Sequence, residues 1–415
     1  MPLLLAAVTV LAYLPSLGGA FQFDDYNVIV NYPTVHSWST LFERAGGGVR
    51  AVLKASYVLN WTLDSGPVGF HIVNIALHAL NAVLLFFFGR RLFGEKPALI
   101  AAMLFALHPM QTEAVTYISG RSSSLMAAFY LCALLAYLRG AHWAISSLLF
   151  VLALATRETA VTLPAALLLV ELVRGTSWRT IAQRQWAHWA LLALGGAVVL
   201  MNPRYFDLLA YGFRERGLGE NLLTQISAIS YLVWHLVRLR GLNIDHALQT
   251  LNGWTSALVA QAVLLSALLV LGLASFRRRP WLAFGILWFF LQLAPTNSIV
   301  PRLDAANDRQ LYLACWGLFL ALAVQIDWPR IALAAAGLVL AAASIARQLD
   351  YRDEIALWEA SVRESPWNSR AHNNLGYAYY LAGRKGEAKR EFRAALFLDP
   401  SAKKARTNLA LLDLD

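Results

Sequence analysis

Two adjacent carboxylates, Asp24 and Asp25, directly follow the first apolar segment of the chain. An ionised side chain at a membrane edge is costly unless it faces water or a partner. Because adjacent side chains on irregular backbone diverge, the two residues are expected to do different jobs. One could be a general base or metal ligand, while the other orients it or caps a turn. The alternative is that both only cap the entry to a loop.

A second polar group begins at His108-Pro109, where the proline ends an apolar helix. Glu113 and Arg121 follow within a few turns, among several serine and threonine hydroxyls. This combination suits the binding of phosphate or sugar. Alternatively, these two residues form ion pairs with each other, or with Arg157 and Glu158, that hold short helices together.

Arg309 and Tyr312 form a third candidate group, because arginine suits the fork-like recognition of phosphate. The alternative is an interfacial belt of arginine and tyrosine. His71 and His78 share one apolar helix and are expected to pack or form hydrogen bonds rather than bind metal. The sequence therefore predicts no cofactor, and it gives no support for a divalent metal.

The composition is that of a polytopic membrane protein. Of 415 residues, 58% are hydrophobic and 14% are charged, whereas soluble proteins carry about 25% charged residues. The net charge of +10 lies largely in short clusters between apolar segments, which indicates cytoplasmic loops and not nucleic-acid binding. Cys132 and Cys315 both lie in apolar segments, which argues against a disulfide framework.

Apolar runs of about 17–25 residues are candidate membrane spans. Eleven segments qualify approximately, and the first is expected to remain as a helix and not to be cleaved as a signal peptide. A further segment, 222–239, is interpreted as re-entrant or interfacial. The predicted spans are 2–20, 70–89, 97–121, 125–138, 143–155, 160–173, 189–200, 256–276, 281–294, 311–326 and 331–346.

Basic clusters at Arg90-Arg91, 174–184 and 277–279 mark the cytoplasmic side. The amino terminus is then inside and the carboxyl tail outside. This topology places five acidic residues at the same outer face, which makes one shared outward-facing site plausible: Asp24, Glu113, Glu158, Asp245 and Asp308.

The composition changes near residue 350 to a charged, helical pattern, so residues 1–348 and 349–415 are predicted to be separate domains. Leu375-Gly376-Tyr377 on one helix, then Ala388, Phe392 and Ala395 on the next, fit a tetratricopeptide repeat. A preceding half-unit and a capping helix complete the tail. Because about three repeats are needed for independent stability, this tail should lean on the membrane domain, another copy or a partner.

Several motifs together resemble the transmembrane-and-tetratricopeptide-repeat family of protein O-mannosyltransferases and its bacterial relatives, in the GT-C glycosyltransferase class. The likeness covers nearly the whole chain, and its two most specific stretches are GFHIVNIALH at 69–78 and HPMQTEAV at 108–115, which continues to Arg121. The others are FDDYNVIVN at 23–31, the stretch from Arg50 to Asn60, RETAVTLP at 157–164, and DRQLY at 308–312.

This resemblance implies a catalytic carboxylate in the first outer loop, carried here onto Asp24 with Asp25 as its neighbour. In this class the acid deprotonates an acceptor hydroxyl, which attacks the anomeric carbon of a sugar on a polyprenyl phosphate. The residues expected to bind the donor phosphate or sugar are Arg50, His108, Glu113, Arg121, Arg157, Glu158, Arg309 and Tyr312.

The sequence therefore predicts an inverting glycosyltransferase in a bacterial inner membrane, with its site and tail on the periplasmic side. Its expected partners are a polyprenyl-phosphate sugar, membrane lipid and a protein acceptor that binds through the tail. A serine or threonine hydroxyl is the favoured acceptor. The alternatives are transfer to a lipid or surface glycan, and a membrane-anchored repeat scaffold without activity.

Overall fold

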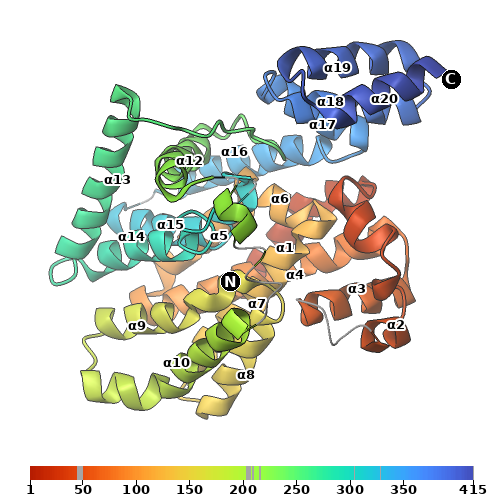
Figure 1. The fold of residues 1–415 in the computed structure, drawn as a ribbon. Helices are drawn as coiled ribbons and strands as arrows, with labels where there is room; N and C mark the ends of the chain where they lie inside the picture. Colours follow the sequence, from red (N-terminus) through yellow and green to blue (C-terminus); the bar gives the residue numbers. More distant parts are fainter. Residues whose placement is uncertain are drawn as a thin grey trace.

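The structure is a computed structural model that describes residues 1–43, 50–201, 207, 210–214, 216–302, 304–327 and 329–414. These residues form helices joined by loops, and no β-strand occurs among them (Figure 1). The predicted all-α class is thereby confirmed.

Each of the eleven predicted spans contains a helix, although the bounds differ. Apolar side chains along each segment favour burial in lipid or against neighbouring helices, and proline begins several of them. These helices are α1 (Pro2–Tyr13), α4 (Pro67–Phe93), α5 (Glu95–Leu107), α7 (Arg121–Leu138), α8 (Trp143–Leu154), α9 (Leu163–Val173), α10 (Trp178–Met201), α13 (Ser256–Ala274), α14 (Pro280–Leu293), α15 (Ala314–Gln325) and α16 (Arg330–Leu349).

The count of eleven complete spans is not confirmed. Among the described residues, four helices are long and apolar enough to cross a membrane: Pro67–Phe93, Ile118–Leu138, Ser256–Ala274 and Arg330–Leu349. A fifth is obtained if α5 and its continuation Pro109–Val115, bent by 58°, count as one span. Helices such as α8, with 12 residues, are about 18 Å long and fall short of a hydrocarbon core about 30 Å thick.

Helices α4, α5, α7, α14 and α15 pack against one another in the centre of the bundle (Figure 1). Their contact includes the buried aromatic residues Phe88, Trp288 and Trp316. Helices α14 and α15 cross closely at Gly285 and Gly317, where a Cβ on Gly285 would lie 2.4 Å from the carbonyl oxygen of Gly317. Small residues allow such close helix packing within membranes.

Helices α12 (Leu218–Arg238) and α13 lie at the edge of the bundle (Figure 1). Helix α12 buries Ala228 and Leu232 but exposes Trp234 and Val237, and it is not among the helices that are apolar enough to span. The re-entrant or interfacial interpretation of residues 222–239 stays a prediction. Only 11% of the most apolar stretch of α13 is buried, as expected for a lipid-facing helix.

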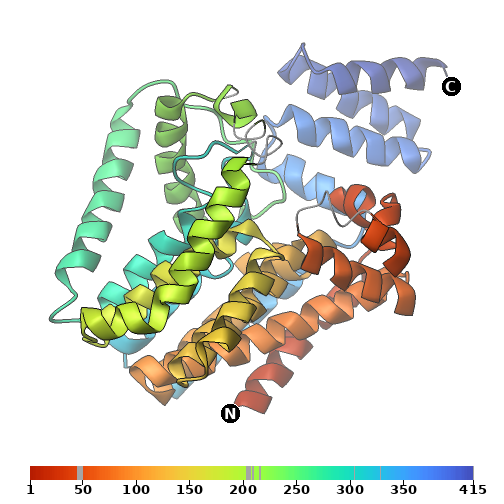
Figure 2. The ribbon, with the colours of Figure 1, turned by 60° about the horizontal axis from the view of Figure 1, so that its bottom comes forward.

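Short elements and loops fill the end of the bundle that faces the tail. After α1 they are η1 (Leu14–Gly18), η2 (Tyr26–Val30), η3 (Pro33–Val35), α2 (Trp38–Glu43) and α3 (Ala51–Leu63). Later segments add η5 (Pro109–Gln111), α6 (Thr112–Val115), η6 (Ile118–Gly120), η7 (Glu158–Thr162) and η8 (Asp308–Leu311). The amino terminus lies at the opposite end of the molecule (Figure 2).

The tail contains α17 (Glu354–Glu364), α18 (Ser369–Leu381), α19 (Lys385–Leu398) and α20 (Lys403–Leu414), which pack in sequence. The predicted repeat is α18 with α19, where Ala388, Phe392 and Ala395 are fully buried. Gly376 lets the two helices approach, because a Cβ there would lie 2.7 Å from the Phe392 ring. Helices α17 and α20 match the expected half-unit and cap.

The tail was expected to lean on the membrane domain, on another copy or on a partner. The structure shows contacts between the tail and the membrane domain. Ala20 donates its N–H to the Arg352 carbonyl at 3.1 Å, and the Phe23 ring packs edge-on against Trp358. Arg370 forms ion pairs with Asp245, at 2.5 Å, and Asp304, at 2.7 Å. The tail is therefore fixed to the loops at one end of the helix bundle. The domain boundary at 348–349 stays a prediction, and α16 ends at Leu349.

Candidate active site

The Asp25 carboxylate joins two loops. Its Oδ2 accepts the Gln22 N–H at 3.0 Å, its Oδ1 accepts the Ser119 N–H at 2.8 Å, and the Ser119 hydroxyl donates to the same Oδ1. The residue is 1% exposed, and burial raises the pKa of Asp25 to about 7. Asp25 thus connects the first loop to the turn before α7 through contacts that suit a positioning role, and its catalytic role stays a prediction.

The turn that receives Asp25 depends on a glycine. A Cβ on Gly120 would lie 2.3 Å from the Glu113 carbonyl oxygen, closer than any side chain tolerates. Glycine therefore lets η6 fold tightly against α6. This close approach places Tyr117 and Ser119 beside the first outer loop, where each contacts one of the two aspartates.

Asp24 differs from Asp25 because it lines a cavity, whereas Asp25 is buried. Its backbone N–H donates to the Tyr117 hydroxyl at 2.9 Å, and the residue lines a cavity of about 520 Å³. Burial raises the pKa of Asp24 above its usual 3.8, although Arg309 and Tyr117 oppose that effect. A carboxylate that faces a cavity, with a raised pKa, suits a general base.

Phe23 holds Asp24 in place from the other side. Its φ of 47° lies in the left-handed region, which is unusual for a bulky residue. Two contacts with α17 stabilise this conformation: the Phe23 N–H donates to Glu354 Oε1 at 2.5 Å, and the ring packs on Trp358 with centroids 5.0 Å apart. Strained backbone of this kind clusters at functional sites.

The cavity beside Asp24 carries an excess of positive charge. Among the described residues that line it, five are basic and two are acidic. The basic residues are Arg50, Lys54, Arg157, Arg302 and Arg309, and the acidic ones are Asp24 and Glu158. Burial, followed by Arg309 and Arg302, holds the pKa of Arg157 well below its usual value. Such a concentration of cations suits an anionic ligand.

Several of these side chains are held by partners at the cavity wall. Arg50 donates to both carboxylate oxygens of Glu158, at 3.0 and 2.9 Å, and Arg157 donates to the Ser123 hydroxyl. Although burial opposes it, Arg50 lowers the pKa of Glu158 below its usual value. The first contact brings η7 against the start of α3, 108 residues away in the sequence, and the second joins the loop before η7 to α7.

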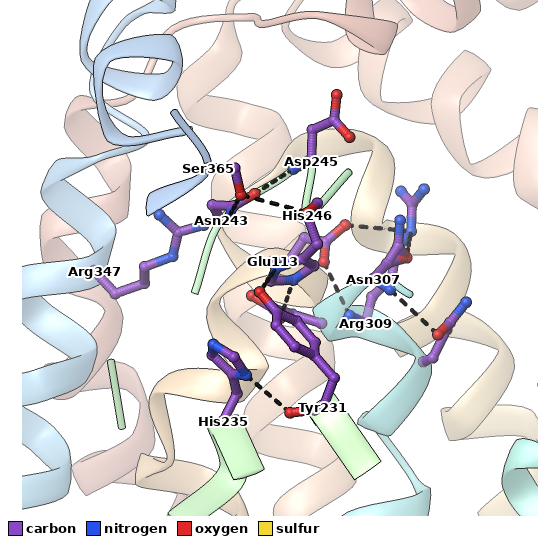
Figure 3. Close-up of polar contacts among 12 residues, drawn as sticks. Glu113, Tyr231, His235, Asn243, Asp245, His246, Asn307, Arg309, Arg347 and Ser365 are labelled. Carbon is purple, nitrogen blue, oxygen red and sulfur yellow. Dashed lines mark hydrogen bonds and ion pairs between the residues drawn. The ribbon is translucent and has the colours of Figure 1, made fainter. Parts of the chain in front are cut away.

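Arg309 is oriented by Glu113 (Figure 3). Its backbone N–H donates to Glu113 Oε2 at 3.0 Å, and its Nε lies 3.4 Å from Glu113 Oε1 and 2.9 Å from Asn307 Oδ1. Burial acts to lower the pKa of Arg309, but Glu113, Tyr117 and Asp24 together raise it. Arg309 is thus a fixed cation at the cavity, and Glu113 acts through it.

A chain of buried polar contacts runs behind Arg309 to the tail (Figure 3). The Tyr231 hydroxyl lies 2.9 Å from His246 Nδ1, and His246 Nε2 lies 2.8 Å from Asp308 Oδ1. From the tail, Ser365 donates its hydroxyl to the His246 carbonyl at 3.4 Å. This chain links α12 and the tail to the loop that carries Arg309.

Four expected donor-binding residues do not line the main cavity: Glu113, which contacts Arg309 from outside the lining, and Arg121, His108 and Tyr312. Arg121 donates to Asn74 Oδ1 at 2.7 Å and to the carbonyls of Ser56 and Phe70. His108 Nε2 lies 2.9 Å from the Leu236 carbonyl, and the Tyr312 hydroxyl lies 2.9 Å from His78 Nδ1. Their donor-binding role stays a prediction, while the geometry shows contacts that join helices.

No sequence pattern predicted that Lys54 and Arg302 line the cavity. None predicted that His246 and Arg370 link the helix bundle to the tail. Lys54 lies in the first turn of α3, four residues after the N-cap Arg50, and both residues line the cavity. Arg302 lies in a loop and Arg370 in the first turn of α18, where no hydrophobic periodicity indicates the direction of a side chain. Among the described residues, no group of three or more His, Cys, Asp or Glu side chains could hold a metal ion.

Asp25→Asn is expected to lower the stability of the folded protein by about 1–3 kcal/mol, because an amide cannot accept from all three donors and leaves a buried group unpaired. Thermal unfolding of the purified protein in detergent measures this effect. Asp24→Asn is the matched control and should leave the unfolding midpoint nearly unchanged. A stable but inactive Asp25→Asn protein would contradict the positioning role and favour Asp25 as the base.

Two family models match parts of this chain. Residues 63–203 match the dolichyl-phosphate-mannose-protein mannosyltransferase family, and residues 369–402 match the tetratricopeptide repeat. No solved structure shows a significant match.

Curated relatives agree with these matches. The chain is 25% identical to a protein O-mannosyl-transferase of Caenorhabditis elegans over 96% of its own length and 63% of the relative's. It is 32% identical to protein O-mannosyl-transferase TMTC3 of Mus musculus, over 32% of this chain and 16% of that protein. It is 34% identical to protein O-mannosyl-transferase Tmtc1 of Drosophila melanogaster, over 38% of this chain and 21% of that protein.

The chain thus spans less than two thirds of the length of these relatives. The matched segments contain the motifs at 69–78, 108–121 and 157–164 and the repeat in the tail. The resemblance to protein O-mannosyltransferases and the tetratricopeptide repeat in the tail are confirmed.

Proposed function

We propose that this protein is an integral-membrane glycosyltransferase that moves a sugar from a polyprenyl phosphate to a protein serine or threonine hydroxyl outside the cytoplasm. The names of its relatives make mannose the first sugar to test. The observation that carries the proposal is the cavity that holds Asp24 beside five basic side chains. A lipid-bound phosphate donor requires this combination of charge and base at a membrane face.

In the proposed reaction the acceptor oxygen attacks the anomeric carbon of the sugar. The bond from that carbon to the phosphate oxygen breaks, and its electron pair leaves with the lipid phosphate. Asp24 takes the proton of the acceptor hydroxyl. Arg309 and its basic neighbours stabilise the phosphate as negative charge develops on it. Attack opposite the leaving group inverts the anomeric configuration.

The direct test supplies purified protein with radiolabelled mannose on a polyprenyl phosphate together with extracytoplasmic proteins as acceptors. The expected result is label in protein that β-elimination releases, with little label transferred from a nucleotide-sugar donor. The Asp24→Asn protein is the matched control for background. Label found in lipid or in a surface glycan would overturn the protein acceptor, and transfer from the nucleotide sugar alone would overturn the donor assignment.

A further inference from the structure

A second hollow lies between the first outer loop and the tail. Its volume is about 460 Å³, and Phe23, Asp24 and Asn27 form its wall on the loop side. On the tail side it is lined by residues that include Asn374, Lys403 and Lys404. Asp24 and Asn27 line both this hollow and the basic cavity, so the two spaces meet at the proposed base.

We propose that this hollow binds the acceptor polypeptide as an extended segment with acidic residues next to the accepting serine or threonine. This inference rests on the proposed function, because it assigns the acceptor side of the same reaction. An inverting transfer needs acceptor and leaving phosphate on opposite sides of the sugar. Because Asp24 and Asn27 line both the basic cavity and the hollow, an acceptor in the hollow can reach a sugar whose phosphate lies in the basic cavity.

The walls of the hollow offer unused polar groups for a peptide backbone. The side chain of Asn27 makes no hydrogen bond to any part of the chain that the structure describes. Asn374 Oδ1 accepts from Asn373 Nδ2 at 3.1 Å, while its own Nδ2 has no partner within the described ranges. An amide side chain on each side can pair with the N–H and C=O groups of an extended peptide.

The lining of the hollow carries three basic side chains, Arg370, Lys403 and Lys404, and two carboxylates, Asp24 and Asp399. Arg370 is already paired with Asp245 and Asp304, and Asp399 accepts from the Ser401 N–H at 2.9 Å. Lys403 and Lys404 are exposed and form no ion pair with the described residues. Two ammonium groups thus remain for the ligand, and carboxylates flanking the acceptor hydroxyl complement them.

The test measures binding and transfer separately on the full-length protein. Two labelled serine peptides are compared, one flanked by aspartate and one by lysine, by fluorescence anisotropy without donor. The wild type is expected to bind the acidic peptide about tenfold more tightly at low salt, and the difference should shrink as ionic strength rises. Lys403→Glu with Lys404→Glu should remove this preference.

A matched variant changes the same charge elsewhere on the tail, Lys385→Glu with Arg390→Glu, and should bind both peptides like the wild type. With the lipid-phosphate donor added, the Lys403/Lys404 variant should show a raised KM for the acidic peptide and an unchanged kcat. The inference is overturned if the wild type binds the two peptides equally. It is also overturned if the Lys403/Lys404 variant keeps the preference for the acidic peptide. In either case, sugar transfer by the protein would leave the proposed function standing. Lysine-dependent peptide binding without any transfer supports the hollow and overturns the function.

Discussion

Asp24→Asn is expected to lower the rate of sugar transfer at least about 100-fold, with the fold and donor affinity little changed. Asparagine keeps the size of the side chain but cannot take the acceptor proton. If Asp24 only capped a loop, the exchange would be nearly silent, because asparagine is among the best capping residues. The measurement is single-turnover transfer from a polyprenyl-phosphate sugar under saturating donor.

The dependence of the rate on pH provides an independent check of the same prediction. A general base works only when deprotonated, and burial raises the pKa of Asp24 above its usual 3.8. The wild-type rate should therefore fall as the pH is lowered through that raised value. The residual rate of the asparagine protein should lack this acid limb. A fully active, monodisperse Asp24→Asn protein would exclude Asp24 as the base.

Arg309→Lys is expected to weaken donor binding about 10–100-fold, and Arg309→Ala still more. A phosphate contact exists before the reaction starts, so its loss appears in donor affinity and not only in turnover. Lysine retains the charge but loses the planar fork that contacts Glu113 and faces the cavity. Binding of a labelled polyprenyl-phosphate sugar to the purified variants measures the effect.

Arg309→Ala also leaves the Glu113 carboxylate buried without its cation, so the lysine variant keeps the test informative if the alanine protein unfolds. Arg121→Ala is the contrasting variant. Because Arg121 donates to Asn74 and to two carbonyls, its replacement by alanine should lower thermal stability more than it lowers donor affinity. Unchanged donor affinity in a folded Arg309→Lys protein would argue against the phosphate contact.

Sequence patterns predicted the helices better than the site. The apolar segments and the repeat in the tail produced helices because burial in lipid, or against the next helix, dictates each of them. The different surroundings of Asp24 and Asp25 fit the expectation that the two residues do different jobs, which stays a prediction. Asp25 is the buried residue of the pair because it accepts hydrogen bonds from donors distant in sequence, mainly the N–H and hydroxyl of Ser119. No local sequence pattern reveals these donors.

Polar residues inside apolar segments were the hardest to interpret. Arg121 and His108 lie in the most specific motifs, yet their side chains bond to Asn74 and to backbone carbonyls. Within a membrane domain, a charged or polar side chain needs a polar partner, and either a ligand or a neighbouring helix can supply it. Type and spacing therefore cannot separate the two uses, and the three-dimensional position of each side chain decides.

The left-handed backbone of Phe23 has a consequence for how the protein loses structure. Helix α17 supplies both contacts that hold Phe23, through Glu354 and Trp358, so opening of the tail would remove the support on one side of Asp24 and leave the contact with Tyr117 on the other. We therefore expect the amide hydrogens of the tail and of the Phe23 segment to exchange more readily than those of the helix bundle. Mild heating that frays α17 is then expected to displace Asp24 well before the helix bundle itself melts.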